Sequence, residues 1–377
     1  HGDAVLAQDA FLRFAAEAVA PVAEQIHRQD RTVPESLLQP LREMGVFGLS
    51  IPESYGGTAP DGSENALVMI AVTEALSEAS LAAAGSLITR PEILARALLA
   101  GGTEEQKRRW LPGVCSGRTI MAVAMTEPGG GSDLKAMRTT AVRDGDHYVV
   151  NGSKTFISNG PCCDLVLLAC KTDPAAGAKG VSLIMVEANR PGFRRGRKLQ
   201  KVGQPAAETA KLFFDVVRVP VANRLGEENK GFSYLMHDLA QERFILTLGA
   251  ACTLERLLGI TIEYVKGRRA FNQTVWDFQN TRFKLADIKT QAVAVRTLVD
   301  HYLGEHMRRR LTSEESAVAK LFATETLWRC IDEMVQLHGG YGYMLDYPIA
   351  RAFADMRVTR VYGGTSEVMR ELISRKL

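Results

Sequence analysis

The chain lacks several features that would each indicate a particular class of protein. None of its 377 residues belongs to an uninterrupted apolar run approaching the ~18 residues of a membrane-spanning helix, so no membrane insertion is expected. His1-Gly2-Asp3 leads directly into amphipathic sequence, so no secretory signal is expected. The six cysteines contain no Cys-x-x-Cys pair, which argues against a metal site and against a disulfide framework. These absences favour a metal-free protein of the reducing cytoplasm.

Strong charge and the common nucleotide-binding loops are lacking as well. The net charge of +3 is too small to indicate a nucleic-acid partner. There is no Gly-x-Gly-x-x-Gly or Gly-x4-Gly-Lys loop, and there are no internal repeats. What remains is an ordinary composition, 46% hydrophobic and 24% charged, in a chain long enough for two or three domains.

Three regions with different patterns follow one another along the chain. Residues 1–120 are rich in Ala and Leu at helical spacing, and Thr103 followed by Gln106 predicts a capping box. Residues 121–226 contain short β-prone runs, and residues 227–377 return to the helical period. The order of helices, strands and helices excludes an alternating α/β sheet and predicts an α+β chain of three domains with these boundaries.

The middle region supports specific strand predictions. Strands are expected at 164–170, 180–187 and 210–219, where Val, Leu, Ile and Phe predominate. Asn151-Gly152 lies between two β-prone runs, which predicts a hairpin turn at that dipeptide.

A glycine-rich segment opens the middle region. The run from Ala124 to Asp133 contains three consecutive glycines, which let backbone N–H groups approach a ligand closely. Thr126 and Ser132 add hydroxyl donors. Taken alone, the segment fits a plain surface loop equally well.

One carboxylate lies on an apolar helical face. In a helix expected from about 231 to 266, residues at offsets of −7, −3, +4 and +7 share the face of Glu242, and they are Leu235, Leu239, Leu246 and Gly249. A charge there is costly unless it is paired or functional. Two interpretations remain open: a structural salt bridge, for example with Arg243, or a general base whose pKa is raised by burial.

Five dispersed motifs give a resemblance that covers nearly the whole chain. In order they are Ala124–Asp133, Lys154–Gly160, Arg268–Gln273 with Gln279, Gln336–Gly342 and Val361–Glu367. Together they resemble the acyl-CoA dehydrogenase family. The resemblance implies a helical N-terminal domain, a central β-barrel-like domain, a C-terminal four-helix bundle and one FAD per subunit.

The resemblance also implies which residues hold FAD. Met125, Thr126, Phe156 and Ser158 would lie against the flavin ring, with Phe156 where many relatives have tryptophan, and Gly131 and Ser132 would lie near the pyrophosphate. A second set would reach the cofactor of a neighbouring subunit, so a dimer or homotetramer is implied: Arg268, Phe271, Gln279, Gln336, Gly339 and Gly340. Asn272 stands where glycine is usual, and Asn tolerates the left-handed backbone conformation such a turn requires. Thr365 and Glu367 complete the cofactor contacts.

The position of the catalytic base departs from the commoner family pattern. Many members carry a glutamate directly after the tyrosine of the last motif, but here Gly363 follows Tyr362. The long-chain and isovaleryl branch keeps its base at the position of Glu242, which favours the catalytic interpretation of this residue. The N–H of Gly363 remains available to the thioester carbonyl, and Tyr362, Arg243 and Ser132 would contact the substrate.

Three other titratable residues are weaker candidates for proton transfer. Glu255, next to Arg256, is expected to form an ion pair, and Glu367 to lie at the cofactor end of its motif. His338 is expected to be packed or bonded to the backbone.

The function implied is FAD-dependent dehydrogenation of a saturated acyl-CoA to the trans-2-enoyl thioester in fatty acid β-oxidation, with electrons passed to an electron-transfer flavoprotein. Three alternatives remain: a dehydrogenase acting on acyl-carrier-protein thioesters, an oxidase, and a non-catalytic flavoprotein paralogue. Gly363 is the feature that favours the last alternative, and Glu242 is the feature that opposes it.

Overall fold

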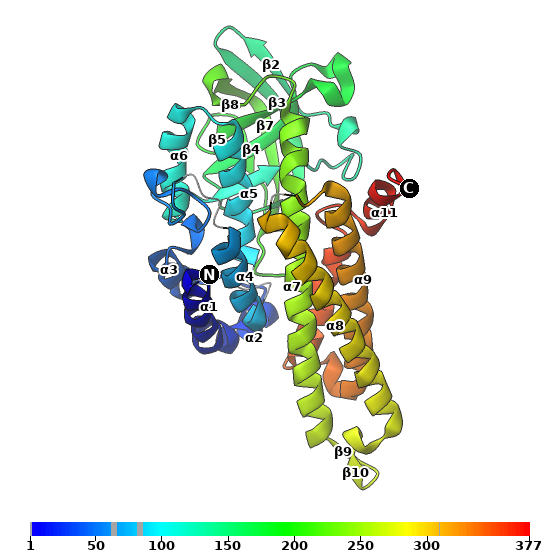
Figure 1. The fold of residues 1–377 in the computed structure, drawn as a ribbon. Helices are drawn as coiled ribbons and strands as arrows, with labels where there is room; N and C mark the ends of the chain where they lie inside the picture. The colour runs from blue at the N-terminus through cyan, green and yellow to red at the C-terminus, as the bar shows by residue number, and fades with distance from the viewer. Residues whose placement is uncertain (1, 62–65, 81–85, 309) are drawn as a thin grey trace.

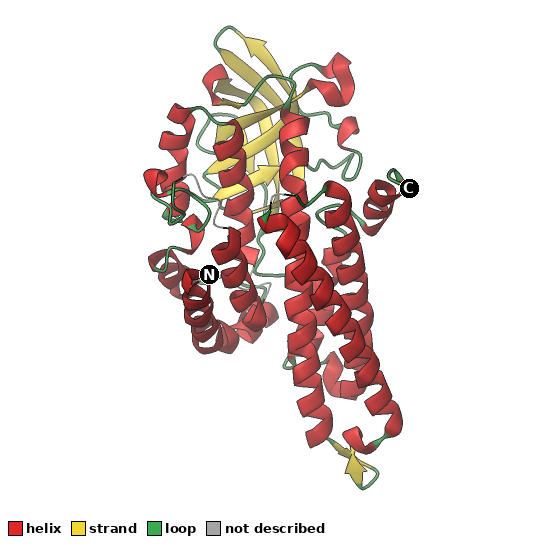
Figure 2. Ribbon diagram, viewed as in Figure 1, coloured by secondary structure: helices red, strands yellow, loops and turns green. Residues whose placement is uncertain are grey.

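The computed structural model describes residues 2–61, 66–80, 86–308 and 310–377. A sheet occupies one end of the molecule, and helices from both ends of the sequence lie below it (Figures 1 and 2). The predicted fold class is confirmed: helical N- and C-terminal parts enclose a central β region in the sequence.

The N-terminal part is helical. Its helices are α1 (Gly2–Phe14), α2 (Ala20–Arg28), α3 (Glu35–Glu43), α4 (Ala66–Ser80), α5 (Ser86–Gly101) and α6 (Glu104–Cys115). The predicted capping box at the start of α6 is confirmed. The Gln106 N–H donates to Thr103 Oγ1 at 3.2 Å, and the Thr103 N–H donates to Gln106 Oε1 at 3.0 Å.

The central part is one eight-stranded sheet. Its strands are β1 (Met121–Ala124), β2 (Thr140–Asp144), β3 (His147–Ser158), β4 (Leu165–Lys171), β5 (Val181–Glu187), β6 (Phe193–Arg195), β7 (Thr209–Pro220) and β8 (Arg224–Leu225). The order is β6-β7-β3-β2-β4-β5-β8, and β1 pairs with β4 in parallel. The strands predicted at 164–170, 180–187 and 210–219 are confirmed as β4, β5 and β7.

Both faces of β4 are buried, which explains its continuous apolar run. Leu165 and Leu167 pack against α5 and α6, whereas Val166 and Leu168 join a core built from other strands. The sheet therefore curves round a core of its own while α5 and α6 cover its outer face.

The hairpin predicted at Asn151-Gly152 is wrong. β3 continues through both residues, and the chain turns earlier, at Gly145 and Asp146 between β2 and β3. Asn151 Oδ1 instead accepts a hydrogen bond from the backbone N–H of Val216 on β7 at 2.9 Å, beside a break in the β3–β7 register. The dipeptide forms a bulge because pairing with β7 overrides its local preference for a turn.

The C-terminal part is built on three long helices that pack side by side (Figure 1). They are α7 (Gly231–Gly267), α8 (Gln279–Met307) and α9 (Ser313–His338), with α10 (Pro348–Met356) against α9 and α11 (Ser366–Ser374) at the end. A small hairpin, β9 (Arg269–Ala270) and β10 (Gln273–Thr274), connects α7 to α8. The helix expected from about 231 to 266 is confirmed as α7.

By length and composition, α7 is apolar enough to cross a membrane. Its most apolar window has a mean hydropathy of 1.5, but 67% of that window is buried inside the protein. Burial to this extent is typical of a core helix, which accounts for the apolar sequence.

Candidate active site

Glu242 and Gly363 are neighbours in space. A Cβ built on Gly363 would lie 4.0 Å from Oε1 of Glu242, although one residue lies on α7 and the other on the loop before α11. Gly363 has a φ of 62°, and its Cβ would also come within 2.7 Å of Leu246 Cδ1. The backbone conformation and the close side chain both favour glycine here. The half-buried carboxylate of Glu242 thus lies beside the space that a side chain at position 363 would enter.

Two buried cations hold the loop that contains Gly363. Arg243, 4% exposed, donates from Nε to the Gly363 carbonyl at 3.4 Å and from Nη1 to Ser313 Oγ at 3.0 Å. Lys320 on α9, 1% exposed, donates from Nζ to the Gly364 carbonyl. The two consecutive carbonyls therefore point to cations from different helices, which fixes the orientation of the loop.

Burial and, to a smaller extent, the nearby Arg243 guanidinium together lower the pKa of Lys320 to about 8, while the charge of Glu242 opposes the shift. Burial also lowers the pKa of Arg243, again opposed by Glu242. Both cations thus interact electrostatically with Glu242. Sequence reasoning missed Lys320, although a signal was present: it lies on a face of α9 with the buried Ala317 and Thr324.

The residue before Glu242 joins two helices. Gln241 donates from Nε2 to Oε1 of Glu92 on α5 at 3.2 Å, and Ser50 Oγ donates to Oε2 of the same carboxylate. All three side chains are buried. These bonds fix α7 against α5 next to Glu242, and sequence reasoning missed them because the partners are distant in sequence.

Tyr362 is connected to the rest of the protein through Gln204. Nε2 of Gln204 lies 3.5 Å from the Tyr362 hydroxyl oxygen and 3.0 Å from the Asp355 carbonyl, to which it donates. Asp355 Oδ1 accepts the backbone N–H of Gln204 and lies 3.0 Å from His27 Nε2. The tyrosine is therefore part of a polar network that extends to α2.

Thr365 and Glu367 begin α11. Thr365 Oγ1 accepts the N–H of Val368 at 3.2 Å, so this hydroxyl caps the helix. Glu367 is 81% exposed and lies 3.6 Å from Arg370. The structure thus places Glu367 on the surface, away from the Glu242–Gly363 pair.

The two segments expected to contact the flavin ring are joined directly. The Thr155 N–H donates to the Thr126 carbonyl at 2.9 Å. Lys154, fully buried, donates from Nζ to the Met125 carbonyl and to Glu127 Oε1, each at 2.9 Å. The glycine-rich segment is therefore fixed to β3 at the residues that precede Phe156 and Ser158.

This region has the surface that a large planar ligand requires. Phe156 is 69% exposed and has a φ of 58°, which is rare for a bulky residue and marks a constrained position. A Cβ on Gly129 would meet nothing within 4 Å, and one on Gly131 only Thr126 Cγ2 at 3.9 Å; Ser132 is exposed beside them. An exposed aromatic ring beside open glycine backbone fits FAD, with the ring at Phe156 and the phosphates at the glycines.

The second set of residues, predicted to contact the cofactor of a neighbouring subunit, lies at the opposite end of the molecule, near the β9–β10 hairpin (Figure 1). Arg268 stacks over the ring of Tyr341 at 5.4 Å, and Phe271 is 90% exposed. Gln279 and Gln336 are exposed, and a Cβ on Gly339 or Gly340 would meet nothing within 4 Å. α7 is about 55 Å long at 1.5 Å per residue, and it ends at Gly267, next to this hairpin.

Three smaller predictions concern the same helices. Asn272 has a φ of 62°, so the predicted left-handed conformation is confirmed. His338 is packed as predicted: it is buried, its Nδ1 lies 2.8 Å from the Met334 carbonyl, and burial lowers its pKa. Glu255 forms an ion pair, but its partner is Arg296 on α8 at 2.6 Å and not the adjacent Arg256.

The comparisons with known proteins cover the whole chain. Models of the N-terminal, middle and C-terminal domains of acyl-CoA dehydrogenase match residues 3–118, 122–217 and 229–377. The mitochondrial long-chain specific acyl-CoA dehydrogenase of Rattus norvegicus is 40% identical over 97% of this chain and 84% of that protein.

Solved structures agree. An acyl-CoA dehydrogenase from Geobacillus kaustophilus has a TM-score of 0.92 and 41% identity, covering 100% of this chain and 98% of that one. A chain from a structure described as the electron transferring flavoprotein of Acidaminococcus fermentans has a TM-score of 0.93 and 34% identity, covering 100% and 98%. The chain therefore belongs to the acyl-CoA dehydrogenase family, whose members are FAD-dependent oxidoreductases acting on CH–CH groups.

Proposed function

We propose that this chain dehydrogenates a saturated acyl-CoA to the trans-2-enoyl thioester and that Glu242 removes the α-proton. The observation that carries the proposal is the 4.0 Å between Glu242 Oε1 and the Cβ position of Gly363. Position 363 carries no carboxylate, and Glu242 brings one to the same space from α7. A half-buried carboxylate on an otherwise apolar helix face suits a general base.

The loop that contains Gly363 would supply the second part of the chemistry. As the α-proton leaves, negative charge builds up on the thioester oxygen, and a fixed N–H donor stabilises that charge. The Gly363 N–H is such a donor, and the bonds from Arg243 and Lys320 to the next carbonyls hold its peptide in place. Tyr362 and Ser132 would contact the substrate beside it. FAD, when bound, supplies the acceptor for the β-hydride.

Two subunits would build each cofactor site. Met125, Thr126, Gly131, Ser132, Phe156 and Ser158 of one chain would hold the flavin from the sheet side, with Thr365 and Glu367 at the near end of α11. The distal set around Arg268 and Phe271 would come from a neighbour, since it lies at the other end of its own chain. Exposed apolar side chains on that end, Phe271 at 90% and Tyr343 at 81%, suit a subunit interface. A homotetramer and domains of 1–120, 121–226 and 227–377 belong to this proposal.

The electron acceptor would be an electron-transfer flavoprotein, in the cytoplasm. Support comes from the structural neighbour whose description names an electron transferring flavoprotein. The Rattus norvegicus relative, named as long-chain specific, supports a long acyl chain in fatty acid β-oxidation.

A second candidate is a dehydrogenase or oxidase for carrier-protein thioesters. It is favoured by a structural neighbour described as the prolyl acyl carrier protein oxidase AnaB, with a TM-score of 0.90 and 28% identity. Tight binding to acyl carrier protein without activity on CoA esters would select this candidate, and hydrogen peroxide formation would identify an oxidase.

The experiment is anaerobic reduction of the purified, FAD-loaded protein by acyl-CoAs of graded chain length. We expect long-chain esters to bleach the oxidised-flavin absorbance band of the wild type, at about 450 nm. Glu242→Gln should slow bleaching by about 10³-fold, in the range for loss of a general base. The matched control is Glu255→Gln, on the same helix but paired with Arg296, which should bleach as wild type does. Equal bleaching by Glu242→Gln and wild type would contradict the base assignment.

A further inference from the structure

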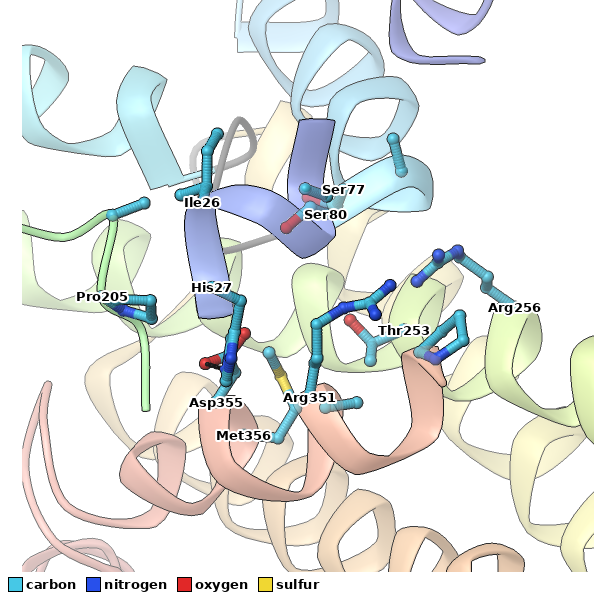
Figure 3. Close-up of a pocket in the computed structure, with 15 residues that line it drawn as sticks. Ile26, His27, Ser77, Ser80, Pro205, Thr253, Arg256, Arg351, Asp355 and Met356 are labelled. Atoms are coloured by element: carbon cyan, nitrogen blue, oxygen red, sulfur yellow. Dashed lines mark hydrogen bonds and ion pairs between the residues drawn. The ribbon is translucent and has the colours of Figure 1, made fainter. Parts of the chain in front are cut away.

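A polar cavity lies between the N- and C-terminal helices, away from Glu242. Its volume is about 40 Å³, and it is bordered by α2, α4, α7, α10 and the loop at Pro205 (Figure 3). Since one water needs roughly 10–15 Å³ measured in this way, the space suits a few waters or one small ion. Arg256, which lines it, follows Glu242 on α7 by 14 residues, or about 21 Å along the helix.

Two guanidinium groups reach this cavity from different helices. Figure 3 shows Arg256 of α7 and Arg351 of α10 extending toward the same space as the Thr253 hydroxyl. Among the described residues, Arg256 has no hydrogen-bond or ion-pair partner, while Arg351 Nη1 donates only to the carbonyls of Leu345 and Asp346, at 2.6 and 3.1 Å. Burial lowers the pKa of Arg256, and the charge of Arg351 lowers it further. Two partly desolvated cations that repel each other are unfavourable unless an anion lies between them.

Three further polar atoms around the cavity also lack partners within the described part of the chain. Ser77 Oγ and Thr253 Oγ1 are buried, with residue exposures of 1% and 4%, and neither has a hydrogen-bond partner within the described part of the chain. The same holds for Nδ1 of His27. Buried polar atoms are nearly always bonded, so three such atoms around one cavity indicate a shared ligand. Thr253 and Arg256 lie three residues apart on α7 and therefore on the same face.

The carboxylates that act electrostatically on Arg351 are Glu24, Asp355 and Asp346, and of these only Asp355 lines the cavity. Asp355 is the one carboxylate among the lining residues, and it lies 3.0 Å from His27 Nε2 and accepts the Gln204 N–H. Glu78, which acts electrostatically on Arg256, is exposed and outside the lining. The lining thus carries two guanidinium groups and one carboxylate, and that carboxylate is already bonded to His27 and Gln204. This balance of charge favours an anion over a cation.

We propose that this cavity binds a small oxyanion, a phosphate or carboxylate group, between Arg256 and Arg351, with the hydroxyls of Ser77 and Thr253 as further donors. Guanidinium groups match the paired oxygens of such anions, and hydroxyls complete the set of donors. The ion would join α4 of the N-terminal part to α7 and α10 of the C-terminal part. The site is independent of the proposed dehydrogenation.

The test is the thermal unfolding temperature of the FAD-loaded protein in inorganic phosphate against chloride at equal ionic strength and pH. At a phosphate concentration about tenfold above its dissociation constant, we expect an increment of about 2 °C over chloride. A parallel series in acetate distinguishes the two sources of the oxyanion: an increment in phosphate alone identifies a phosphate site, and one in acetate a carboxylate site.

Two substitutions assign the increment to the cavity. Arg256→Gln removes one guanidinium, and Thr253→Val removes a hydroxyl while keeping the shape, so it tests the site even if the first variant folds poorly. Both should lose most of the increment. Arg308→Gln makes the same charge change at a side chain 62% exposed, outside the cavity, and should keep it. The proposal is overturned if neither phosphate nor acetate raises the unfolding temperature above its value in chloride, as for a cavity holding only water, or if Thr253→Val keeps the full increment.

Discussion

Oε1 of Glu242 lies 4.0 Å from the point where a Cβ of residue 363 would stand, and residue 363 is a glycine. Helix α7 supplies the carboxylate, and the loop before α11, far away in the sequence, leaves room beside it because it has glycine at this position. The left-handed φ of Gly363 and the nearby Leu246 explain why glycine is favoured there.

Gly363→Ala should therefore destabilise the protein. The new Cβ would be strained at a φ of 62° and would come within 2.7 Å of Leu246 Cδ1, so we expect a loss of about 1–3 kcal/mol in the free energy of unfolding. Gly129→Ala is the control, because a Cβ there meets nothing within 4 Å and should change stability little. Chemical denaturation of the two variants checks this, and equal stabilities would contradict the account of Gly363.

Lys320 should make stability depend on pH above neutrality. Its pKa is about 8 in the folded protein against an ordinary 10.5, because burial disfavours the charged amine. Between these pH values the unfolded chain binds more protons, so the contribution of Lys320 to the free energy of unfolding rises with pH through this interval. Chemical denaturation of wild type and Lys320→Met at about pH 7, 8, 9 and 10 measures this pH dependence. If the free energies of unfolding of the two proteins change in parallel with pH, Lys320 makes no such contribution.

Lys320→Met should also slow the reaction. The substitution removes the hydrogen bond to the Gly364 carbonyl and a positive charge that acts on Glu242. We expect kcat to fall about tenfold or more with flavin still bound, as for a displaced catalytic loop. Lys289→Met, on the exposed surface of α8, is the control. An unchanged kcat in Lys320→Met would show that the loop keeps its orientation without this cation.

If two subunits build each cofactor site, as proposed, variants of the two halves should complement each other. Gly131→Trp should block the sheet-side half of the flavin site, and Gly340→Trp the distal half, since both glycines face open space. Each variant alone should bind little FAD. When the two chains are coexpressed, an assembly of one of each has one intact site, so about half the sites of mixed pairs should recover flavin. No recovery on mixing would mean that each site is built within one chain.

The bulge in β3 gives a stability prediction of its own. A Cβ on Gly152 would lie 2.5 Å from Thr139 Oγ1 and 2.8 Å from Thr139 Cα, at a φ of 147°, so Gly152→Ala should cost about 2–4 kcal/mol. Gly145→Asn, at a φ of 62° in open space, should cost little because Asn adopts this conformation. If Gly145 proved the more sensitive position, the bulge assignment would be wrong.

Local pattern predicted much of this molecule, and contacts between distant segments explain the rest. Periodicity placed Glu242 on an apolar face, because one carboxylate on such a face is visible within a single helix, and the family resemblance then favoured a catalytic role for it. The Asn151-Gly152 dipeptide misled because its partner on β7 is more than sixty residues away, while the dipeptide Gly145-Asp146 makes the actual hairpin. Lys320 stood on the face of α9 that includes Ala317 and Thr324, but only the tertiary structure shows that its amine reaches Gly364.

The most direct test of the account is exchange of the substrate's α-hydrogens with solvent deuterium. An acyl-CoA whose β-carbon is replaced by sulfur can lose the α-proton but has no β-hydrogen to transfer, so exchange reports the base alone. We predict rapid exchange by wild type and by Glu255→Gln, and exchange slowed by about 10³-fold in Glu242→Gln with FAD binding unchanged. Exchange by Glu242→Gln at the wild-type rate would contradict the assignment of Glu242 as the base.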